Sequence, residues 1–224
     1  MPNQDKMLSR RKLLRTAAVL GAGVTLAPGR ILLAQSVARR RTPGETMGPF
    51  YPVTRPLDQD ADLTLLSGRS GRAQGKVIHL TGRVLNGKGE PVAGVRVEVW
   101  QANTHGRYAH PSDNNPAPLD ANFQGFGVQV TDAEGRYRFK TIKPGPYPAD
   151  GSWVRPPHIH FDVTGKVNRL TTQMYFPGEP LNEKDRLLQR QAQKDVLIAQ
   201  RLPPTPDVEP DAEIAVWDIM LDKG

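Results

Sequence analysis

The stretch VIHLTGRVLNGKGEPVAGVRVEVWQ, residues 77–101, decides the fold class. Both of its ends, Val77–Leu85 and Val95–Gln101, are rich in β-branched residues and alternate roughly between apolar and polar positions, which is typical of strands. Between them, Asn86-Gly87-Lys88-Gly89 places Asn or Gly where a turn needs positive φ angles. The stretch therefore predicts two strands and a turn that fixes strand register.

The chain after Thr42 continues this pattern of strands and turns. Pro and Gly recur every few residues, and a second turn, Asp132-Ala133-Glu134-Gly135, separates two of the resulting short segments. Seven short strands suit an all-β fold, a two-sheet β-sandwich with long loops. Besides the two strands above, the predicted strands are Gly127–Thr131, Tyr137–Ile142, His158–Val163, Arg169–Phe176 and Glu213–Leu221.

One segment near the C-terminus is predicted to be a short helix. Asn182–Arg201 begins with Asn as the N-cap, carries acidic residues in its first turn and places Leu187, Val196 and other apolar residues roughly on one face. Pro203 and Pro204 then end the helix.

The composition excludes several kinds of site. The chain has 224 residues, of which 38% are hydrophobic, and this is enough for one sizeable core. It contains no Cys, so disulfides, thiolate zinc sites, iron–sulfur clusters and cysteine nucleophiles are excluded. Residues 1–38 carry +5 of the net charge of +7, which leaves +2 for residues 39–224. We therefore expect no nucleic-acid partner.

Residues 1–38 have the features of an export signal, and residues 39–224 are predicted to form the folded domain. A basic start is followed by Leu13–Ala27, an apolar stretch of small residues. Ser9-Arg10-Arg11-Lys12-Leu13-Leu14 resembles the twin-arginine (Tat) signal, which predicts use of the Tat export machinery and a periplasmic or extracellular location. The alternative is an ordinary basic amphipathic helix, and cleavage of the leader stays open.

Two histidines and two tyrosines form a candidate metal site. His158 and His160 lie two residues apart on a predicted strand, so both imidazoles project from one face, although such pairs are often ordinary strand residues. Tyr147 lies between two prolines in a rigid loop that would aim its side chain, and Tyr108 follows a strand in the setting Gly-Arg-Tyr. The alternative for Tyr147 is a loop aromatic that covers the edge of the core.

The phenols indicate which metal to consider. A phenol, with a pKa near 10, ionises at neutral pH only beside a strong positive charge, such as that of a ferric ion. Two phenolates and two imidazoles match a hard, high-valent ion better than zinc or copper. The residues therefore indicate non-haem Fe(III) and leave open a hydrolase with a zinc His-x-His site, which would need neither tyrosine.

Three motifs together resemble those of the intradiol ring-cleavage dioxygenases, with matching order and spacing. The likeness covers roughly residues 46–185 and the last strand, and it is greatest to the protocatechuate-type branch. The motifs are Gly106-Arg107-Tyr108, Pro144-Gly145-Pro146-Tyr147-Pro148 and Arg155-Pro156-Pro157-His158-Ile159-His160.

The resemblance implies both an activity and the roles of the four candidate ligands. Tyr108, Tyr147, His158 and His160 would bind non-haem Fe(III), and Tyr147 would leave the metal and accept a proton when a catechol binds through both oxygens. Dioxygen would cleave the ring between its two hydroxyl-bearing carbons, and the product would be a cis,cis-muconate-type diacid.

Further residues are implied to lie beside the substrate. Arg155 would stabilise negative charge on the ring, and Gln173 would assist positioning. Gly48 and Pro49 belong to Thr46–Pro52, which resembles the family's N-terminal segment near the active site. The alternatives are an outward salt bridge for Arg155 and a plain extended arm for residues 46–52.

The resemblance leaves the substrate, the partner and one rival function open. Protocatechuate-type enzymes carry an aromatic residue soon after the loop tyrosine, whereas here Ala149, Asp150 and Gly151 precede Trp153, so we predict a different pocket wall. The family also implies a partner, either a second copy of the chain or a related non-catalytic subunit. The rival function is an exported β-sandwich binding module without catalysis, which would lack the four ligands.

Overall fold

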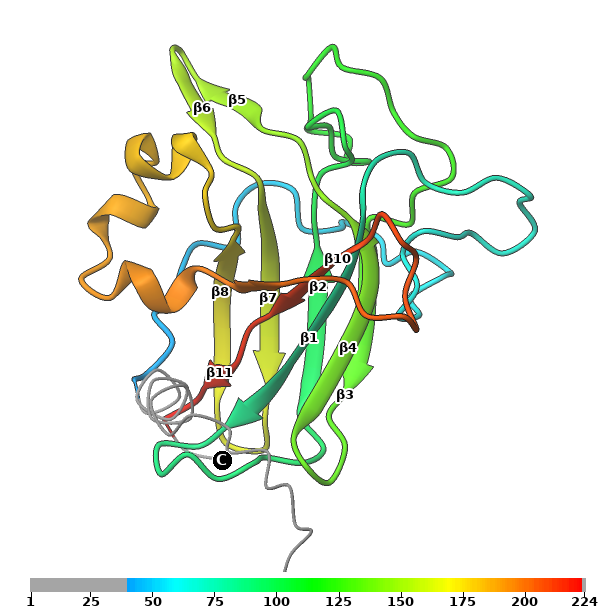
Figure 1. Cartoon of the computed structure of the whole chain (residues 1–224). Helices are drawn as coiled ribbons and strands as arrows, with labels where there is room; N and C mark the ends of the chain where they lie inside the picture. Colours follow the sequence, from blue (N-terminus) through cyan, green and yellow to red (C-terminus); the bar gives the residue numbers. More distant parts are fainter. Residues whose placement is uncertain (1–39, 223–224) are drawn as a thin grey trace, which may run out of the picture.

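The computed structural model describes residues 40–222, so the predicted export signal, residues 1–38, lies outside the described residues. Two β-sheets pack face to face with the hydrophobic core between them, as Figure 1 shows. This arrangement confirms the predicted all-β sandwich with long loops. Within residues 40–222, no helix is both long enough and apolar enough to span a membrane.

The first sheet is built around β1 (Val77–Leu85). On one side, β4 (Arg136–Ile142) pairs antiparallel with β1 along almost its whole length. On the other side, β10 (Glu213–Val216) and β11 (Ile219–Met220) pair one after the other, both parallel to β1. The edge strand β9 (Gln200–Leu202) pairs antiparallel with β10.

The second sheet is antiparallel and carries the candidate site at one end. Its strands lie in the order β3 (Phe126–Val130), β2 (Arg96–Trp100), β7 (His158–Thr164) and β8 (Arg169–Tyr175). Beyond β7 and β8, a short hairpin projects from the upper end of the sandwich in Figure 1. It consists of β5 (Tyr147–Asp150) and β6 (Trp153–Arg155).

The two predicted turns carry the chain from one sheet to the other instead of joining paired strands. The first lies between β1 and β2, and the second lies between β3 and β4. The expected positive φ occurs only at the glycine that closes each turn, +82° at Gly89 and +71° at Gly135. The strands on either side of each turn therefore face each other across the core, and their register is fixed by other partners.

The predicted last strand, Glu213–Leu221, is interrupted at Trp217. The Trp217 amide donates to the Thr81 carbonyl, and the Tyr137 hydroxyl donates to the Trp217 carbonyl over 2.6 Å. A Cβ at Gly82 would lie only 1.8 Å from that carbonyl oxygen, so the step between β10 and β11 requires glycine in β1.

The predicted helix at Asn182–Arg201 does not form, because tertiary contacts override its helical pattern. Asp185 is extended, and its Oδ1 accepts hydrogen bonds from the Leu187 and Leu188 amides. Asn182 is not an N-cap, and its side chain donates to the Phe176 carbonyl. The segment instead contains three 3-10 helices, η1 (Pro180–Lys184), η2 (Leu188–Arg190) and η3 (Lys194–Leu197), followed by β9.

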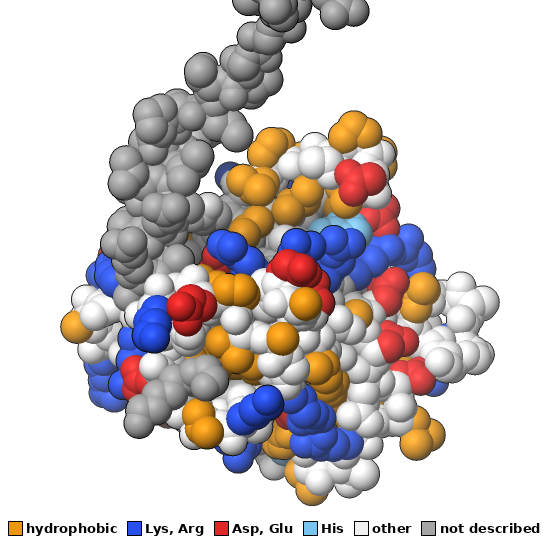
Figure 2. All heavy atoms as spheres, turned by 90° about the horizontal axis from the view of Figure 1, so that it is seen from below, with side chains coloured by type: hydrophobic (Ala, Val, Ile, Leu, Met, Phe, Trp, Pro, Cys, Tyr) orange, Lys and Arg blue, Asp and Glu red, His pale blue; other side chains and the backbone are white. Residues whose placement is uncertain are grey.

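The two ends of the sandwich differ in character. The end seen from below in Figure 2 carries acidic and basic side chains next to one another over its surface. At the other end lies a second, smaller buried cluster of aromatic residues, which includes Trp100, Tyr108 and Tyr147. The predicted site residues gather at this aromatic end.

Candidate active site

Strand pairing places the two histidines at one end of the second sheet. His158 begins β7 opposite Tyr175 of β8, and His160 pairs with Trp100 on one side and Gln173 on the other. The His160 ring stacks on Trp100, with centroids 4.8 Å apart and planes 11° from parallel. The Nε2 atoms of His158 and His160 are 3.2 Å apart, so both imidazoles are directed toward one point.

Both imidazoles are neutral at physiological pH. The rings are 2% exposed, and burial together with the nearby Arg155 lowers the pKa of His158 well below its usual value and that of His160 to about 3. His158 Nδ1 donates to the Pro156 carbonyl over 2.7 Å, which leaves a lone pair on Nε2. His160 Nε2 lies 3.2 Å from this atom and can donate to its lone pair, and a cation that replaces the shared proton would gain both imidazole nitrogens as ligands.

The two tyrosines meet because two loops cross at Gly106. A Cβ there would lie 2.1 Å from the Pro146 carbonyl oxygen, and the residue has φ +78°, so only glycine allows the loops to approach so closely. The crossing brings the rings of Tyr108 and Tyr147 to 5.5 Å between centroids. Tyr147 was predicted in a loop, but it begins β5 and pairs with Arg155 of β6.

Each tyrosine also lies next to one of the histidines. The ring centroids of Tyr147 and His158 are 5.6 Å apart, and those of Tyr108 and His160 are 6.2 Å apart. The structure therefore brings together all four residues that the sequence predicted as metal ligands.

The phenols have no local group that could ionise them. Burial raises the pKa of Tyr108 well above its usual value, and burial also raises that of Tyr147 despite the opposing effect of Arg155. The Tyr108 hydroxyl is buried, and the polar side chain next to it is the phenol of Tyr147. Within the same residues, no group of three or more His, Asp or Glu side chains is placed to hold a metal. A cation bound here would therefore need the phenols as ligands, and this donor set fits a hard trivalent ion.

Arg155 points inward and joins a buried network. Its side chain is 5% exposed, so the outward salt bridge considered from the sequence is wrong. Its Nε donates to Asp185 Oδ2 over 2.7 Å, and its Nη2 donates to Gln173 Oε1 at 2.7 Å and to the Tyr175 hydroxyl at 3.0 Å. Burial alone would lower the pKa of Arg155, but Tyr175, Tyr147 and Asp185 raise it overall. The guanidinium is held rigidly in its charged form.

The arm at residues 46–52 covers the site instead of extending freely. Gln173 Nε2 donates to the Thr46 carbonyl over 2.8 Å and so connects the arm to Arg155. Gly48 has φ +70°, and a Cβ there would lie 3.3 Å from His160 Cε1. The arm therefore passes directly over an imidazole, and glycine permits this approach.

A cavity of about 320 Å³ opens beside these groups. Tyr147 lines it, whereas Tyr108 and Gln173 do not, so Gln173 lies behind Arg155. Ala149 and Trp153, where the sequence departs from the family pattern, both belong to its wall. The lining residues are Thr46, Gly48, Pro49, Phe50, Tyr147, Pro148, Ala149, Trp153, Arg155, His160 and Leu187.

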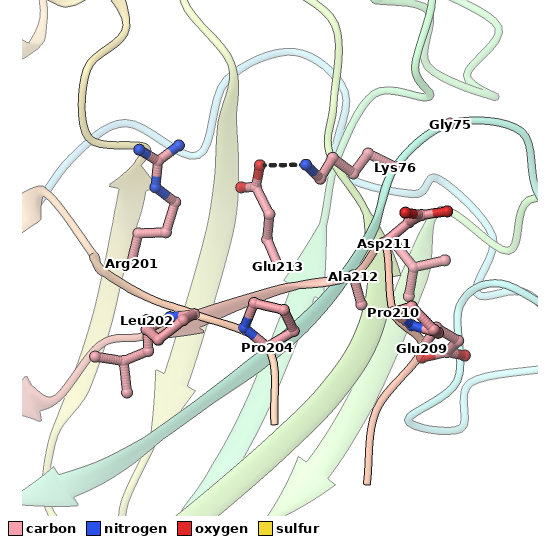
Figure 3. Close-up of a pocket in the computed structure, with 12 residues that line it drawn as sticks. Gly75, Lys76, Arg201, Leu202, Pro204, Glu209, Pro210, Asp211, Ala212 and Glu213 are labelled. Atoms are coloured by element: carbon pink, nitrogen blue, oxygen red, sulfur yellow. Dashed lines mark ion pairs between the residues drawn. The ribbon is translucent and has the colours of Figure 1, made fainter. Parts of the chain in front are cut away.

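A larger groove of about 920 Å³ lies apart from this cluster and contains none of the predicted site residues. In Figure 3, Lys76 and Glu213 point toward each other across it and form an ion pair of 3.0 Å. Glu209, also in its wall, contacts Lys140 at 2.5 Å and His79 at 2.6 Å. Three charged residues of the groove wall, Lys76, Glu209 and Glu213, thus take part in ion pairs, whereas Arg201 and Asp211 form none among residues 40–222.

Sequence reasoning missed three residues of the site. Asp185 was assigned to a helix, and only its place in the fold reveals it as the partner of Arg155. Tyr175 was predicted only as part of the strand Arg169–Phe176, and its hydroxyl accepts from Arg155. Phe50, in the arm, stacks on Tyr108 with centroids 4.6 Å apart, and its place inside the Thr46–Pro52 motif was the one available signal.

Known proteins share both the sequence and the fold. A family model described as "Dioxygenase" matches residues 46–223. A protocatechuate 3,4-dioxygenase beta chain from Burkholderia cepacia is 51% identical over 159 residues, 68% of this chain and 67% of that protein. A hydroxyquinol 1,2-dioxygenase from Rhizobium sp. (strain MTP-10005) is 31% identical over 173 residues, 69% of this chain and 55% of that protein.

One solved structure is similar over most of the chain. It is the dioxygenase domain of a dioxygenase and carbohydrate-binding protein fusion from Streptomyces sp. SirexAA-E, with 28% identity and a TM-score of 0.63. The match covers 83% of this chain and 100% of that chain.

Proposed function

Because this chain belongs to the intradiol ring-cleavage dioxygenase family, we propose that Tyr108, Tyr147, His158 and His160 hold non-haem Fe(III) for catechol cleavage between the hydroxyl-bearing carbons. The observation that carries the proposal is the buried convergence of two phenols and two neutral imidazoles beside a cavity of about 320 Å³. When bound, a ferric ion would ionise the phenols and make a chelated catechol reactive toward dioxygen.

The two tyrosines have different roles in this proposal. Tyr147 lines the cavity, so its Oη is the phenolic oxygen that meets the substrate and takes a proton from a catechol hydroxyl. Tyr108 lies outside the cavity wall, under the stacked ring of Phe50, and stays in place. The product is a cis,cis-muconate-type diacid.

The remaining residues orient the substrate and exclude water. Arg155 faces the cavity with a fixed positive charge and stabilises negative charge that develops on the ring. Gln173 positions Arg155 and the arm together, while Gly48 and Pro49 close the cavity over His160. A non-catalytic binding module would have no use for this buried polar set, and a zinc His-x-His site would leave both phenols without a role.

The test is a spectrum combined with an assay. The purified protein is loaded with Fe(III), and its visible spectrum is recorded without dioxygen, before and after protocatechuate or catechol is added. We expect a broad tyrosinate-to-iron band that shifts with substrate, then one dioxygen consumed per ring-opened diacid on aeration. An iron-loaded protein without the band would contradict the phenolate ligands, and a band without turnover would contradict ring cleavage.

We also propose that residues 1–38 direct export through the twin-arginine route. The support is the Arg10-Arg11 pair before a short apolar stretch. Fractionation of cells that produce the full chain should place the protein outside the cytoplasm, and replacing Arg10 and Arg11 by Lys should retain it inside. Equal export of both forms would contradict this route.

A partner subunit is a proposal of the same kind. Thr46, Gly48, Pro49 and Phe50 of this same chain belong to the cavity wall, which supports a pocket formed without a second chain, either in a homo-oligomer or beside a related non-catalytic subunit. The mass and composition of the active particle would distinguish these two assemblies.

A further inference from the structure

A second cavity, also of about 320 Å³, adjoins the four candidate ligands and is separate from the cavity beside Tyr147. Among residues 40–222, Phe50 alone lines both cavities. Tyr108 and Trp100 also line the second cavity; Phe50 stacks on Tyr108, and Trp100 stacks on His160. The proposed function uses neither this cavity nor its polar groups.

The wall of the second cavity suits a flat, uncharged ring. Its large side chains are mostly aromatic or proline rings, those of Phe50, Trp100, Phe126, Pro52, Pro56 and Pro111. None of the lining residues is Lys, Arg, Asp or Glu. A charged ligand would lose its hydration here without gaining an ionic partner, whereas a neutral aromatic ring can pack against the other rings.

Two hydrogen-bond donors in this wall are unused. Trp100 Nε1 is buried without a partner among residues 40–222, and an indole nitrogen can only donate. His110 Nδ1 accepts from the Ser112 amide over 3.1 Å, so the proton of the neutral ring lies on Nε2. That Nε2 is also buried and has no partner in the described chain.

Gln124 adds an unused acceptor to the same wall. Its Nε2 donates to the Phe126 carbonyl over 2.7 Å and to the Asp60 carbonyl over 3.1 Å, which fixes the orientation of the amide. Its Oε1 is buried and has no partner among residues 40–222. Buried polar groups are normally hydrogen-bonded, so three unmet groups in one wall indicate an occupant that both accepts and donates.

We propose that the second cavity is a binding site for a neutral phenol, distinct from the cavity in which ring cleavage is proposed. The aromatic ring packs against Phe50, Trp100 and Phe126. A phenolic hydroxyl accepts from an indole or imidazole N–H and donates to an amide oxygen, and it stays neutral at physiological pH. The site consists only of groups of this chain and needs no bound metal.

The three tryptophans of the chain lie in three different places, so an NMR titration can locate the bound phenol. Trp100 lines the second cavity, Trp153 lines the cavity beside Tyr147, and Trp217 lies in the core with its Nε1 bonded to the Val196 carbonyl. Phenol is added to the full chain without added metal, and the assigned indole N–H signals are followed. The Trp100 signal should move and saturate, and the Trp217 signal should stay in place.

Substitutions test the hydrogen bonds of the site. His110→Phe keeps a ring but removes the Nε2 donor, so phenol binding at Trp100 should weaken about tenfold. Binding of toluene, which has no hydroxyl, should change less than threefold in the same variant. His105→Phe is the matched control, because it makes the same exchange at an exposed histidine outside the cavity, and it should change neither affinity more than twofold.

Each remaining outcome would overturn the second site. A shift confined to Trp153 would place phenol only in the cavity beside Tyr147, and an unmoved Trp100 signal would mean that water alone satisfies the three polar groups. Equal weakening of phenol and toluene in His110→Phe, or no weakening of either, would exclude the proposed hydrogen bond. Turnover is measured separately: a saturating Trp100 shift in a protein that cleaves no catechol would contradict the proposed function alone.

Discussion

The large groove and the smaller cavity of this molecule differ in how their polar groups are satisfied. Incompletely hydrogen-bonded buried groups, and not a large volume, distinguish the candidate site. The groove of Figure 3 has about three times the volume of the cavity beside Tyr147, roughly 920 against 320 Å³. Yet the groove is open to solvent at its charged residues, some of which are paired with each other, as Lys76 is with Glu213. The smaller cavity instead adjoins two neutral imidazoles with facing nitrogens, and near them the buried Tyr108 hydroxyl has only the Tyr147 phenol beside it.

This difference follows from burial. Charges at the groove keep water as a partner, so imperfect pairing there costs little. Around the cavity, Arg155, Asp185 and His160 are nearly inaccessible, and a polar group left unsatisfied there costs far more. Buried polar and charged side chains of this kind are concentrated at sites that bind ligands or catalyse reactions. The following substitutions test this comparison in order of expected effect.

Removal of an imidazole should have the largest consequence. His160→Ala is expected to lower kcat/KM by about 1,000-fold, or about 4 kcal/mol, and to reduce the iron content, because one of the four proposed ligands is lost. Metal analysis and dioxygen uptake measure both effects. Glu213→Gln, at the groove, is the control and should leave activity within twofold. Equal activity of His160→Ala and the parent protein would contradict the assignment of the active site to the smaller cavity.

Loss of the partner of Arg155 should mainly affect stability. Asp185→Asn leaves a buried guanidinium without its anion, and the free energy of unfolding should fall by about 3 kcal/mol in a denaturant titration. The double variant Arg155→Met/Asp185→Leu removes both charges and should recover much of this stability while ring cleavage stays impaired. Recovery of activity in the double variant would contradict the role of Arg155.

Tyr147→Phe should keep the fold and lower kcat about 100-fold, since the proposed proton acceptor at the cavity is removed. The tyrosinate band of the iron-loaded protein should weaken but persist through Tyr108. Stopped-flow turnover and the visible spectrum measure these outcomes. Full turnover in this variant would show that the catechol proton goes elsewhere.

The smallest effect is expected at the groove, where Glu209→Gln should lower the free energy of unfolding by no more than about 1 kcal/mol at neutral pH and leave activity unchanged. Hydrogen bonds from Lys140 and His79 hold the pKa of Glu209 below its usual value. The stabilisation is therefore complete above the ordinary Glu pKa of about 4.3 and fades as the pH falls below it. Denaturant titrations at neutral and acidic pH should show that the difference in free energy of unfolding between the parent protein and Glu209→Gln becomes smaller in acid. A difference that grows in acid would contradict the lowered pKa of Glu209.

Some residues of the site could be predicted from sequence because their signals are local. The alternation of His158 and His160 on a strand, and the prolines on both sides of Tyr147, act over a few residues. The resemblance carried by these motifs then added Arg155 as a residue expected beside the substrate. Asp185 had no such signal, because the surrounding sequence matches a helical pattern and its partner, Arg155, lies 30 residues away in the chain.

The sequence by itself determined the all-β class, the two-sheet sandwich, the motifs and the absence of any thiol ligand. These features follow from composition and from the alternation of apolar and polar residues, which are properties of short segments. Only the tertiary structure decided that both turns cross between sheets, that Trp217 divides the last strand and that residues 182–201 do not form one helix. It also decided that Gly106 and Pro146 touch and so bring the two phenols together. These outcomes depend on which distant segment packs against each residue, and the energy of such contacts outweighs local preference.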